Sequence, residues 1–331
     1  MPASLAVRLI AAAALMGAAA PVAASAATGD DCPTWLPDFR CERSGRWEGF
    51  HPPMVAFPLF EDPFITTGLQ AYHMWHDFPK QSVMGGGHAH GVAVQARVAL
   101  TDRLALIATK DGYVWNRPNS PLLNDTQGFL NIAGGLKYAL FVDEERRIIV
   151  SPVLRFELPI GSTDTLQGYG DGAVLPSVSA AWGPGSWRFQ GSFGSQIPLN
   201  GAEQSASLFY HLNAAYDTGG RFQPFVQVSG LTWVHSGDGK LPVKLKSGIV
   251  TGNEVTLDAA QDVTGSGRAE GADVFNLGSR GVAGQDLVTW AVGGTFALTK
   301  HVTLGFGYER PLTDRKGIFQ QRVTSTLVLE Y

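Results

Sequence analysis

From about residue 68 onward, apolar side chains alternate along the chain with small or polar ones, in segments of roughly ten residues. In the segment WRFQGSF, for example, Trp187, Phe189 and Phe193 share one face. Arg188 and Gln190 lie on the other face. Because successive side chains of a β-strand point to opposite faces, this period of two residues predicts strands with one apolar and one polar face.

The connections between these predicted strands are by turns short and long. The short ones are LTDR, VDEER, GPGS, DTGG and LTKH, and the longest intervening link is residues 236–284. Short turns at one end and long loops at the other are typical of an outer-membrane β-barrel. We therefore expect an all-β fold over residues 68–331, an antiparallel transmembrane barrel of about twelve strands with short periplasmic turns and long outer loops. The predicted strands are residues 68–77, 89–100, 103–113, 127–140, 146–158, 173–182, 187–197, 206–216, 221–235, 285–298, 301–310 and 321–331.

Physical chemistry also favours a closed barrel in a membrane. In hydrocarbon every backbone N–H and C=O group must be paired within the protein, which a closed sheet achieves and an open one does not. A secreted two-sheet sandwich shows the same alternation, but it has no reason to alternate short and long links. Aromatic residues near both strand ends would form two interfacial girdles. They are Tyr138, Trp182, Trp187, Tyr216, Phe222 and Tyr331 near the turns, and Tyr72, Tyr113, Phe129, Phe156, Trp290 and Tyr308 near the loops.

The first 27 residues have the three parts of a secretory signal peptide. These are the basic Arg8, an apolar run over residues 9–20, and small residues ending in ASA at residues 24–26. The apolar run is too short to span a bilayer as a helix, and no later segment is long and apolar enough. With the predicted barrel, this leader indicates the outer membrane of a Gram-negative-type bacterium.

The charge content argues against a nucleic-acid partner, and the two cysteines suggest a disulfide. Charged residues are only 16% of the chain and the net charge is −4, so no basic excess indicates nucleic acid. Cys32 and Cys41 follow the leader, and in an oxidising compartment they would form a local disulfide, with two unpaired thiols as the alternative. We expect outer-membrane lipid, a small-molecule solute and the barrel assembly machinery as partners, and no cofactor.

Three phrases carry a resemblance to a known family. They are LTDRLALIATKDGY at residues 100–113, YERPLTDR at residues 308–315, and the final TLVLEY. Together with the leader, the arm described next and the twelve predicted strands, they make the chain resemble a family of bacterial outer-membrane β-barrel proteins described as transporters. The chain is also similar in layout to the phenol meta-pathway outer-membrane proteins. The resemblance implies the fold and transport, but its motifs lie in strands and turns and imply no catalytic or binding residues.

Residues 28–67, between the leader and the barrel, form an arm that is too apolar for a solvated tail and too rich in proline for a strand or helix. Such a segment needs a surface to pack against, and the periplasmic mouth of the barrel is the nearest one. We expect a plug that gates or lines the route of an apolar solute, with docking to a periplasmic partner as the alternative. The candidates for plug contacts are Trp35, Phe39, Trp47 and Phe50.

The inward faces of the predicted strands carry charges of both signs. Such a lumen can hold a field across a constriction, as in a channel, or be filled by internal salt bridges, and twelve strands allow either. We favour a channel for small molecules, apolar or aromatic ones included, over a structural or surface-binding barrel with a closed lumen. The lumen-facing candidates are Arg97, Lys137, Arg155, Glu157, Arg188, Glu309 and Arg322.

Four of the eight histidines lie within residues 73–90. His88 and His90 point to the same face of one predicted strand, whereas His73 and His76 point to opposite faces, so at most one of the latter pair can join the former. Three imidazoles without an assured carboxylate or thiolate match no metal-ligand signature. We therefore expect a histidine cluster at the lumen rim or membrane interface, without a metal.

The sequence does not predict an enzyme. Barrels that resemble outer-membrane phospholipases carry a His and a Ser two residues apart on one strand face, where the two can form a hydrogen bond. Here His235 and Ser236 are adjacent, and His211 is followed two residues later by Asn213. We therefore expect no catalytic residues.

Overall fold

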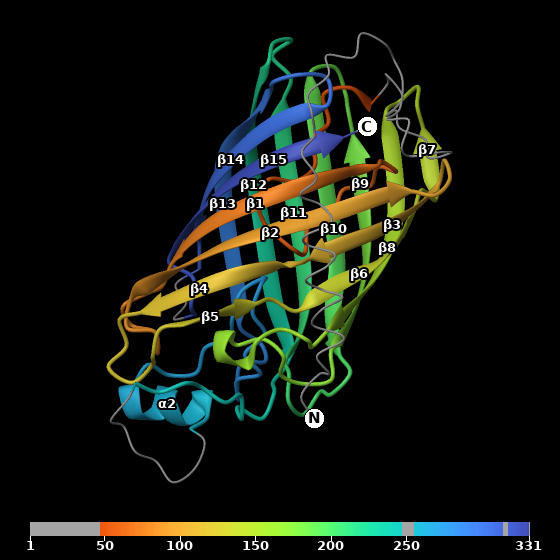
Figure 1. Cartoon of the computed structure of the whole chain (residues 1–331). Helices are drawn as coiled ribbons and strands as arrows, with labels where there is room; N and C mark the ends of the chain where they lie inside the picture. The colour runs from red at the N-terminus through yellow and green to blue at the C-terminus, as the bar shows by residue number, and fades with distance from the viewer. Residues whose placement is uncertain (1–46, 247–254, 314–316, 331) are drawn as a thin grey trace. The chain divides into compact units, whose positions relative to one another are not determined.

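The structure, a computed structural model, describes residues 47–246, 255–313 and 317–330 (Figure 1). The chain divides into two units, residues 1–37 and 38–331, and every described residue belongs to the second. The predicted signal peptide, Cys32, Cys41, Trp35 and Phe39 lie outside the described residues. Their proposed roles, the disulfide included, stay predictions.

The described strands form one antiparallel sheet that closes on itself, because β1 pairs with both β2 and β15 (Figure 1). The prediction of a twelve-stranded barrel is confirmed. The segments β3 and β4 make one barrel strand, as do β5 and β6, and β7 is a short addition beside β8. The strands are β1 (Gly68–Asp77), β2 (Gly87–Ala99), β3 (Leu104–Lys110), β4 (Gly112–Pro118), β5 (Thr126–Phe129), β6 (Ile132–Tyr138), β7 (Phe141–Asp143), β8 (Ile148–Leu158), β9 (Ala173–Trp182), β10 (Trp187–Pro198), β11 (Ala206–Tyr216), β12 (Phe222–His235), β13 (Asp286–Ala297), β14 (Val302–Pro311) and β15 (Gln321–Glu330).

Connections of two lengths alternate around the barrel, as predicted. The end that carries the short turns is called the short-turn end below, and the opposite one the long-loop end. A 3-10 turn, η2 (Thr163–Thr165), and a helix, α2 (Leu257–Thr264), lie in the long connections. None of the described helices is long and apolar enough to cross a membrane.

Two predicted strands prove to be interrupted. The strand expected over residues 103–113 is divided into β3 and β4, and the register between β3 and β6 shifts between Ala108 and Lys110. The strand expected over residues 127–140 breaks before Asn131, whose backbone N–H donates to the Gln167 side chain instead of to a neighbouring strand. Lys110 and Asn131 next to these breaks both donate to Glu157.

Burial alternates along each strand in the predicted period of two. In β10, for example, Arg188 and Gln190 are buried, whereas Trp187 and Phe193 are 45% and 59% exposed. Apolar side chains outside and polar ones inside reverse the arrangement of a water-soluble sheet and suit a wall in contact with hydrocarbon. The closed sheet also rules out the two-sheet sandwich.

Aromatic side chains lie on the outer face near both strand ends. Tyr138, Trp182, Trp187, Tyr216 and Phe222 are exposed near the short turns, and Tyr113, Phe129, Phe156, Trp290 and Tyr308 are exposed or half-buried near the loops. The placement of Tyr72 in the outer girdle is wrong, because its side chain is buried and its hydroxyl contacts Pro53 and Gln95. Tyr72 shares the inner face of β1 with Gln70 and Met74, so the register of the strand prevails over aromatic character.

Candidate functional site in the barrel lumen

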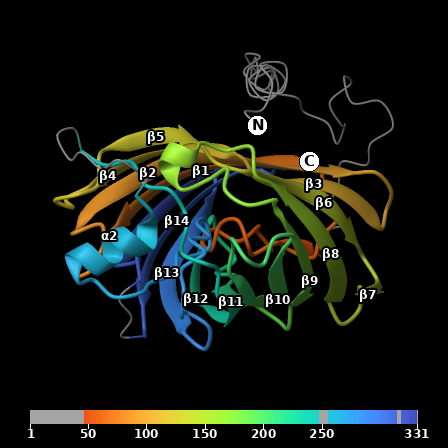
Figure 2. The same cartoon turned by 90° about the horizontal axis from the view of Figure 1, so that it is seen from below.

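Residues 47–67, the described part of the predicted arm, run inside the ring of strands (Figure 2, orange-red). Near the short-turn end, Gln190 and Gln223 of the wall donate to the carbonyls of His51 and Gly49, at 2.8 and 2.7 Å. The chain then reaches residues 56–60 deep in the lumen and returns to β1 at the end where it entered. These residues form a hairpin-shaped insert, called the lumen hairpin below.

Three aromatic side chains hold the two legs of the lumen hairpin together. The ring centroids of Trp47, Phe50 and Phe64 lie 4.9 to 6.1 Å apart. All three side chains are buried, and they pack with wall residues that include Ile149. Two of the predicted plug contacts, Trp47 and Phe50, therefore cluster with the return leg of the same hairpin.

Arg155 of β8 holds the tip of the lumen hairpin. Its guanidinium donates to the carbonyl oxygens of Pro58 and Leu59, at 2.7 and 3.1 Å. The side chain is fully buried, and its Nε has no hydrogen-bond partner among the described residues. Beside it the Phe60 ring stacks on the imidazole of His211, with 5.0 Å between centroids. The tip is thus held by hydrogen bonds to its backbone and by ring stacking.

Two carboxylates on the return leg form ion pairs with two cations of the wall. Arg97 binds both carboxylate oxygens of Glu61, at 2.8 and 2.9 Å, and Lys137 binds Glu61 and Asp62 at 2.8 and 3.0 Å. All four side chains are at most 3% exposed. Two positive and two negative charges therefore neutralise one another, and bidentate geometry of this kind is strong. We call Arg97, Lys137, Glu61 and Asp62 the arm lock.

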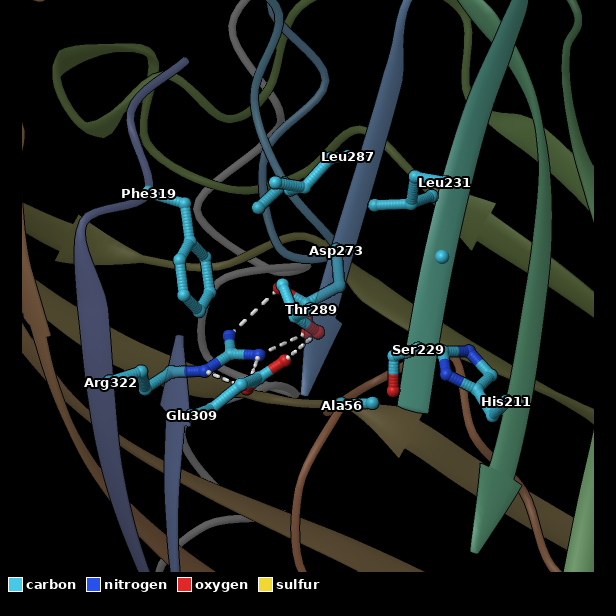
Figure 3. Close-up of a pocket in the computed structure, with 12 residues that line it drawn as sticks. Ala56, His211, Ser229, Leu231, Asp273, Leu287, Thr289, Glu309, Phe319 and Arg322 are labelled. Atoms are coloured by element: carbon cyan, nitrogen blue, oxygen red, sulfur yellow. Dashed lines mark hydrogen bonds and ion pairs between the residues drawn. The ribbon is translucent and has the colours of Figure 1, made fainter. Parts of the chain in front are cut away.

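A second charged group lies nearer the long-loop end (Figure 3). Arg322 binds both oxygens of Asp273, at 2.8 and 2.7 Å, and it also binds Glu309 at 2.8 Å. Thr289 donates to Glu309 at 2.6 Å. Asp273 belongs to the long link between β12 and β13, so a loop enters the lumen from one end as the hairpin enters from the other.

A cavity separates the two inserted segments (Figure 3). Ala56 of the lumen hairpin borders it on one side and Asp273 of the loop on another, with His211 and Arg322 of the wall between them. The volume of the cavity is about 20 Å³, which is room for one water. The space between the two segments therefore holds a water and nothing larger.

The link between β12 and β13 is folded where it is described. Leu257 and Phe275 join an apolar cluster that extends down to Phe57 of the lumen hairpin. The carboxylate of Glu270 accepts from the Ser205 hydroxyl at 2.6 Å and from backbone N–H groups of the link. Apolar packing and these hydrogen bonds hold this link over the long-loop end.

One tyrosine outside the strands lies beside this link. Burial, aided by the nearby carboxylates of Asp238 and Glu203, raises the pKa of Tyr169 to about 12.

All seven predicted lumen-facing side chains are buried. Arg97 and Lys137 meet in the arm lock, Arg155 holds the hairpin tip, and Glu309 and Arg322 meet near the loop. Two others pair separately, Glu157 with Lys110 at 2.7 Å and Arg188 with Asp217 at 2.6 Å.

Sequence reasoning missed the partners of these wall charges. Glu61 and Asp62 stand together in the apolar stretch FPLFEDPF, and two adjacent carboxylates in such a stretch need cations when they are buried. That signal was available. Lys110 follows a register shift and Asp273 lies in a long link. Neither side chain can be assigned to the lumen from the alternation of the sequence.

The histidines divide between the two faces of the wall. His73, His88 and His90 lie on the outer face of β1 and β2, and the His88 ring stacks on Trp75 with 4.1 Å between centroids. His76 points inward, and its Nε2 lies 2.7 Å from the carbonyl oxygen of Ile318. Of His73 and His76, only His73 thus joins His88 and His90 on the outer face, which agrees with the prediction that at most one of them could. Within the described residues, no group of three or more His, Cys, Asp and Glu could hold a metal ion.

We expect protein purified without an affinity tag to contain no stoichiometric zinc or copper. The His88 and His90 rings lie against Trp75, and no carboxylate or thiolate completes a ligand set with them among the described residues. Elemental analysis measures the metal content, with a His88→Ala/His90→Ala double variant as the control. Zinc or copper that is retained by the wild type and lost from this variant would contradict the expectation.

Neither histidine weighed in the sequence as a catalytic candidate is hydrogen-bonded to a serine among the described residues. His235 lies 2.8 Å from the Gly201 carbonyl, while the Ser236 hydroxyl accepts from backbone N–H groups. His211 lies opposite Ser229 of β12, a neighbour that only the cross-strand register shows. Both ring nitrogens of His211 are without a hydrogen-bond partner among the described residues, so this pair lacks the bond that activates a serine.

A closed antiparallel barrel with an apolar outside and a charged lumen defines a transmembrane β-barrel of the outer-membrane type. No family model and no curated protein matches the chain. Among solved structures, the chain is similar to an outer membrane channel from Pseudomonas putida F1, at 14% identity and a TM-score of 0.53, over 85% of this chain and 100% of that one. It also matches the NanC porin at 9% identity and a TM-score of 0.44, over 80% of this chain and 98% of that one. The beta domain of the Bordetella autotransporter BrkA matches at 12% identity and a TM-score of 0.44, over 80% and 100%.

At these identities the likeness shows the fold alone. The expectation that the chain has no catalytic residues stays a prediction. The predicted similarity to the phenol meta-pathway proteins is not confirmed by these matches and stays a prediction.

Proposed function

We propose that the protein is an outer-membrane channel for small molecules, with apolar or aromatic solutes among its cargo. One observation carries the proposal: much of what fills the lumen is supplied by two inserted segments, the lumen hairpin and the long link. Both are held to the wall by side-chain contacts, so displacement of either segment widens the route without breaking the barrel. The leader of residues 1–27 would direct export, and the barrel assembly machinery would insert the chain.

The surfaces along the narrow route support a solute with apolar parts. The cavity between the two segments is bordered by Leu231, Leu287 and Phe319 as well as by the charged group around Arg322. The lumen hairpin adds the aromatic side chains of its tip. A solute that passes here would meet apolar and charged surfaces at the same time.

Planar lipid bilayers test the proposal. We expect the purified, folded protein to give discrete conductance steps, small ones because the route is narrow, and heat-unfolded protein of the same preparation to give none. Silence from a barrel that remains folded in the same detergent would overturn the proposal.

The second candidate is a structural or surface-binding barrel with a closed lumen. The specific observation that favours it is the cavity of about 20 Å³, too small for any solute larger than water. The two candidates differ in whether the inserted segments move.

A further inference from the structure

The buried charges of the barrel divide by position. Among the described residues, the buried charged side chains on the strands are six cations and two carboxylates. The cations are Arg97, Lys110, Lys137, Arg155, Arg188 and Arg322, and the carboxylates are Glu157 and Glu309. The buried charged side chains outside the strands are all carboxylates, namely Glu61, Asp62, Asp258, Glu270 and Asp273. The wall is therefore strongly positive, and the inserted segments supply much of the negative charge.

Three of the wall cations rely on the lumen hairpin. The carboxylates that contact Arg97 and Lys137 in the described structure are Glu61 and Asp62 of the hairpin. Arg155 has carbonyl oxygens of the hairpin tip as acceptors, and its Nε is left unpaired. If the hairpin withdrew, all three cations would lose these partners together.

A buried cation that loses its partner is costly, so hairpin withdrawal must be coupled to water or to another anion. A solute carboxylate has the same two oxygens as Glu61 and can accept the same bidentate bonds from a guanidinium. An aromatic surface lies next to this site, since the Phe209 ring is 5.9 Å from the Arg155 guanidinium carbon. The site thus offers both charge and apolar contact.

We propose that Arg97, Lys137 and Arg155 form a binding site for small carboxylates with an apolar body, and that Glu61 and Asp62 occupy it as tethered substitutes. The site rests on the proposed channel function and names its substrate class. A solute carboxylate competes with the hairpin, and the hairpin yields when the solute replaces its charges. The same wall then lines a cationic route that admits anions in preference to cations.

Titration calorimetry of the folded full-length protein with benzoate tests the site, with benzamide as the neutral probe of the same shape. We expect Glu61→Gln/Asp62→Asn to bind benzoate at least about tenfold more tightly than the wild type, because the competing charges are gone. Benzamide should bind weakly to both.

Two further variants complete the test. Arg97→Gln/Lys137→Gln, added to the neutralised hairpin, should abolish the gain. Lys110→Gln in the same background should keep it, since the partner of Lys110 is Glu157 of the wall. Equal benzoate affinity in the wild type and in Glu61→Gln/Asp62→Asn would overturn the proposal, as would equal binding of benzamide and benzoate.

Calorimetry does not depend on conductance, so the two proposals fail separately. Conductance without benzoate binding would overturn the carboxylate site and leave the channel. Benzoate binding to a barrel that stays silent in bilayers would overturn the channel and leave the site.

Discussion

Deleting residues 30–62 should leave a barrel that assembles and conducts several-fold more current per channel than the full-length protein. The deletion removes both carboxylates of the arm lock, the hairpin tip and the aromatic residues Trp47 and Phe50. The strand ladders do not include these residues, so the wall remains closed through its β1–β15 pairing. A wider and more positive lumen should also shift the reversal potential in a salt gradient toward that of chloride.

The matched control is deletion of residues 30–46, which leaves the lumen hairpin in place. Single-channel recordings of the two deletions and of the full-length protein give the comparison. Because the control keeps the lumen hairpin, its conductance should stay well below that of the deletion of residues 30–62. If deletion of residues 30–62 leaves conductance unchanged in a folded barrel, the hairpin does not obstruct the route.

Leu327→Arg should destabilise the folded barrel by about 2 to 4 kcal/mol if the residue lies near the bilayer midplane. Leu327 is 38% exposed on the outer face of β15, where its neighbours are Ala71 and Leu304. An arginine there would place its charge in hydrocarbon. Urea unfolding in lipid vesicles measures the loss, with Leu327→Met as the control of similar volume.

The adjacent residue should respond differently. Thr326 is buried, and its hydroxyl lies 2.8 Å from the Met54 sulfur of the lumen hairpin. Thr326→Arg should therefore displace the hairpin and alter conductance while the wall keeps most of its stability. Equal loss of stability in Leu327→Arg and Thr326→Arg would contradict the assignment of the two faces.

The fold was predictable because the alternation of apolar and polar residues is imposed by two unlike solvents along the whole length of a strand. Arg188 and Phe193 show the effect in a single strand, one buried and one exposed. The breaks beside Lys110 and Asn131 were not predictable from the sequence. The first depends on how β3 pairs with β6, and the second on a hydrogen bond from the Asn131 backbone to Gln167 in a distant loop. The face of Tyr72 was misjudged because aromatic character was given more weight than strand parity.

Of the candidate site, the residues of the wall were predictable from the sequence and their partners in the inserted segments were not. The wall cations other than Lys110 could be assigned to the inner face from their parity along alternating strands. Their partners could not, because the pairing of Arg97 with Glu61 depends on how a proline-rich segment folds back inside the barrel. The register that places His211 opposite Ser229 was not predicted either, because it depends on how two separate strands pair.

The lumen hairpin enters and leaves through the same mouth, and this has a consequence for biogenesis. No chain end has to be threaded across the lumen, so the hairpin can come to rest on an open sheet before the first and last strands meet. Its polar contacts include Ser151, Arg155 and Ser179 on β8 and β9. Others lie on the two strands that meet at the β1–β15 seam, where Gln70 and Tyr72 donate to the Pro53 carbonyl and Thr326 contacts Met54. The hairpin therefore bridges opposite parts of the wall and helps to join the first and last strands once the seam is closed.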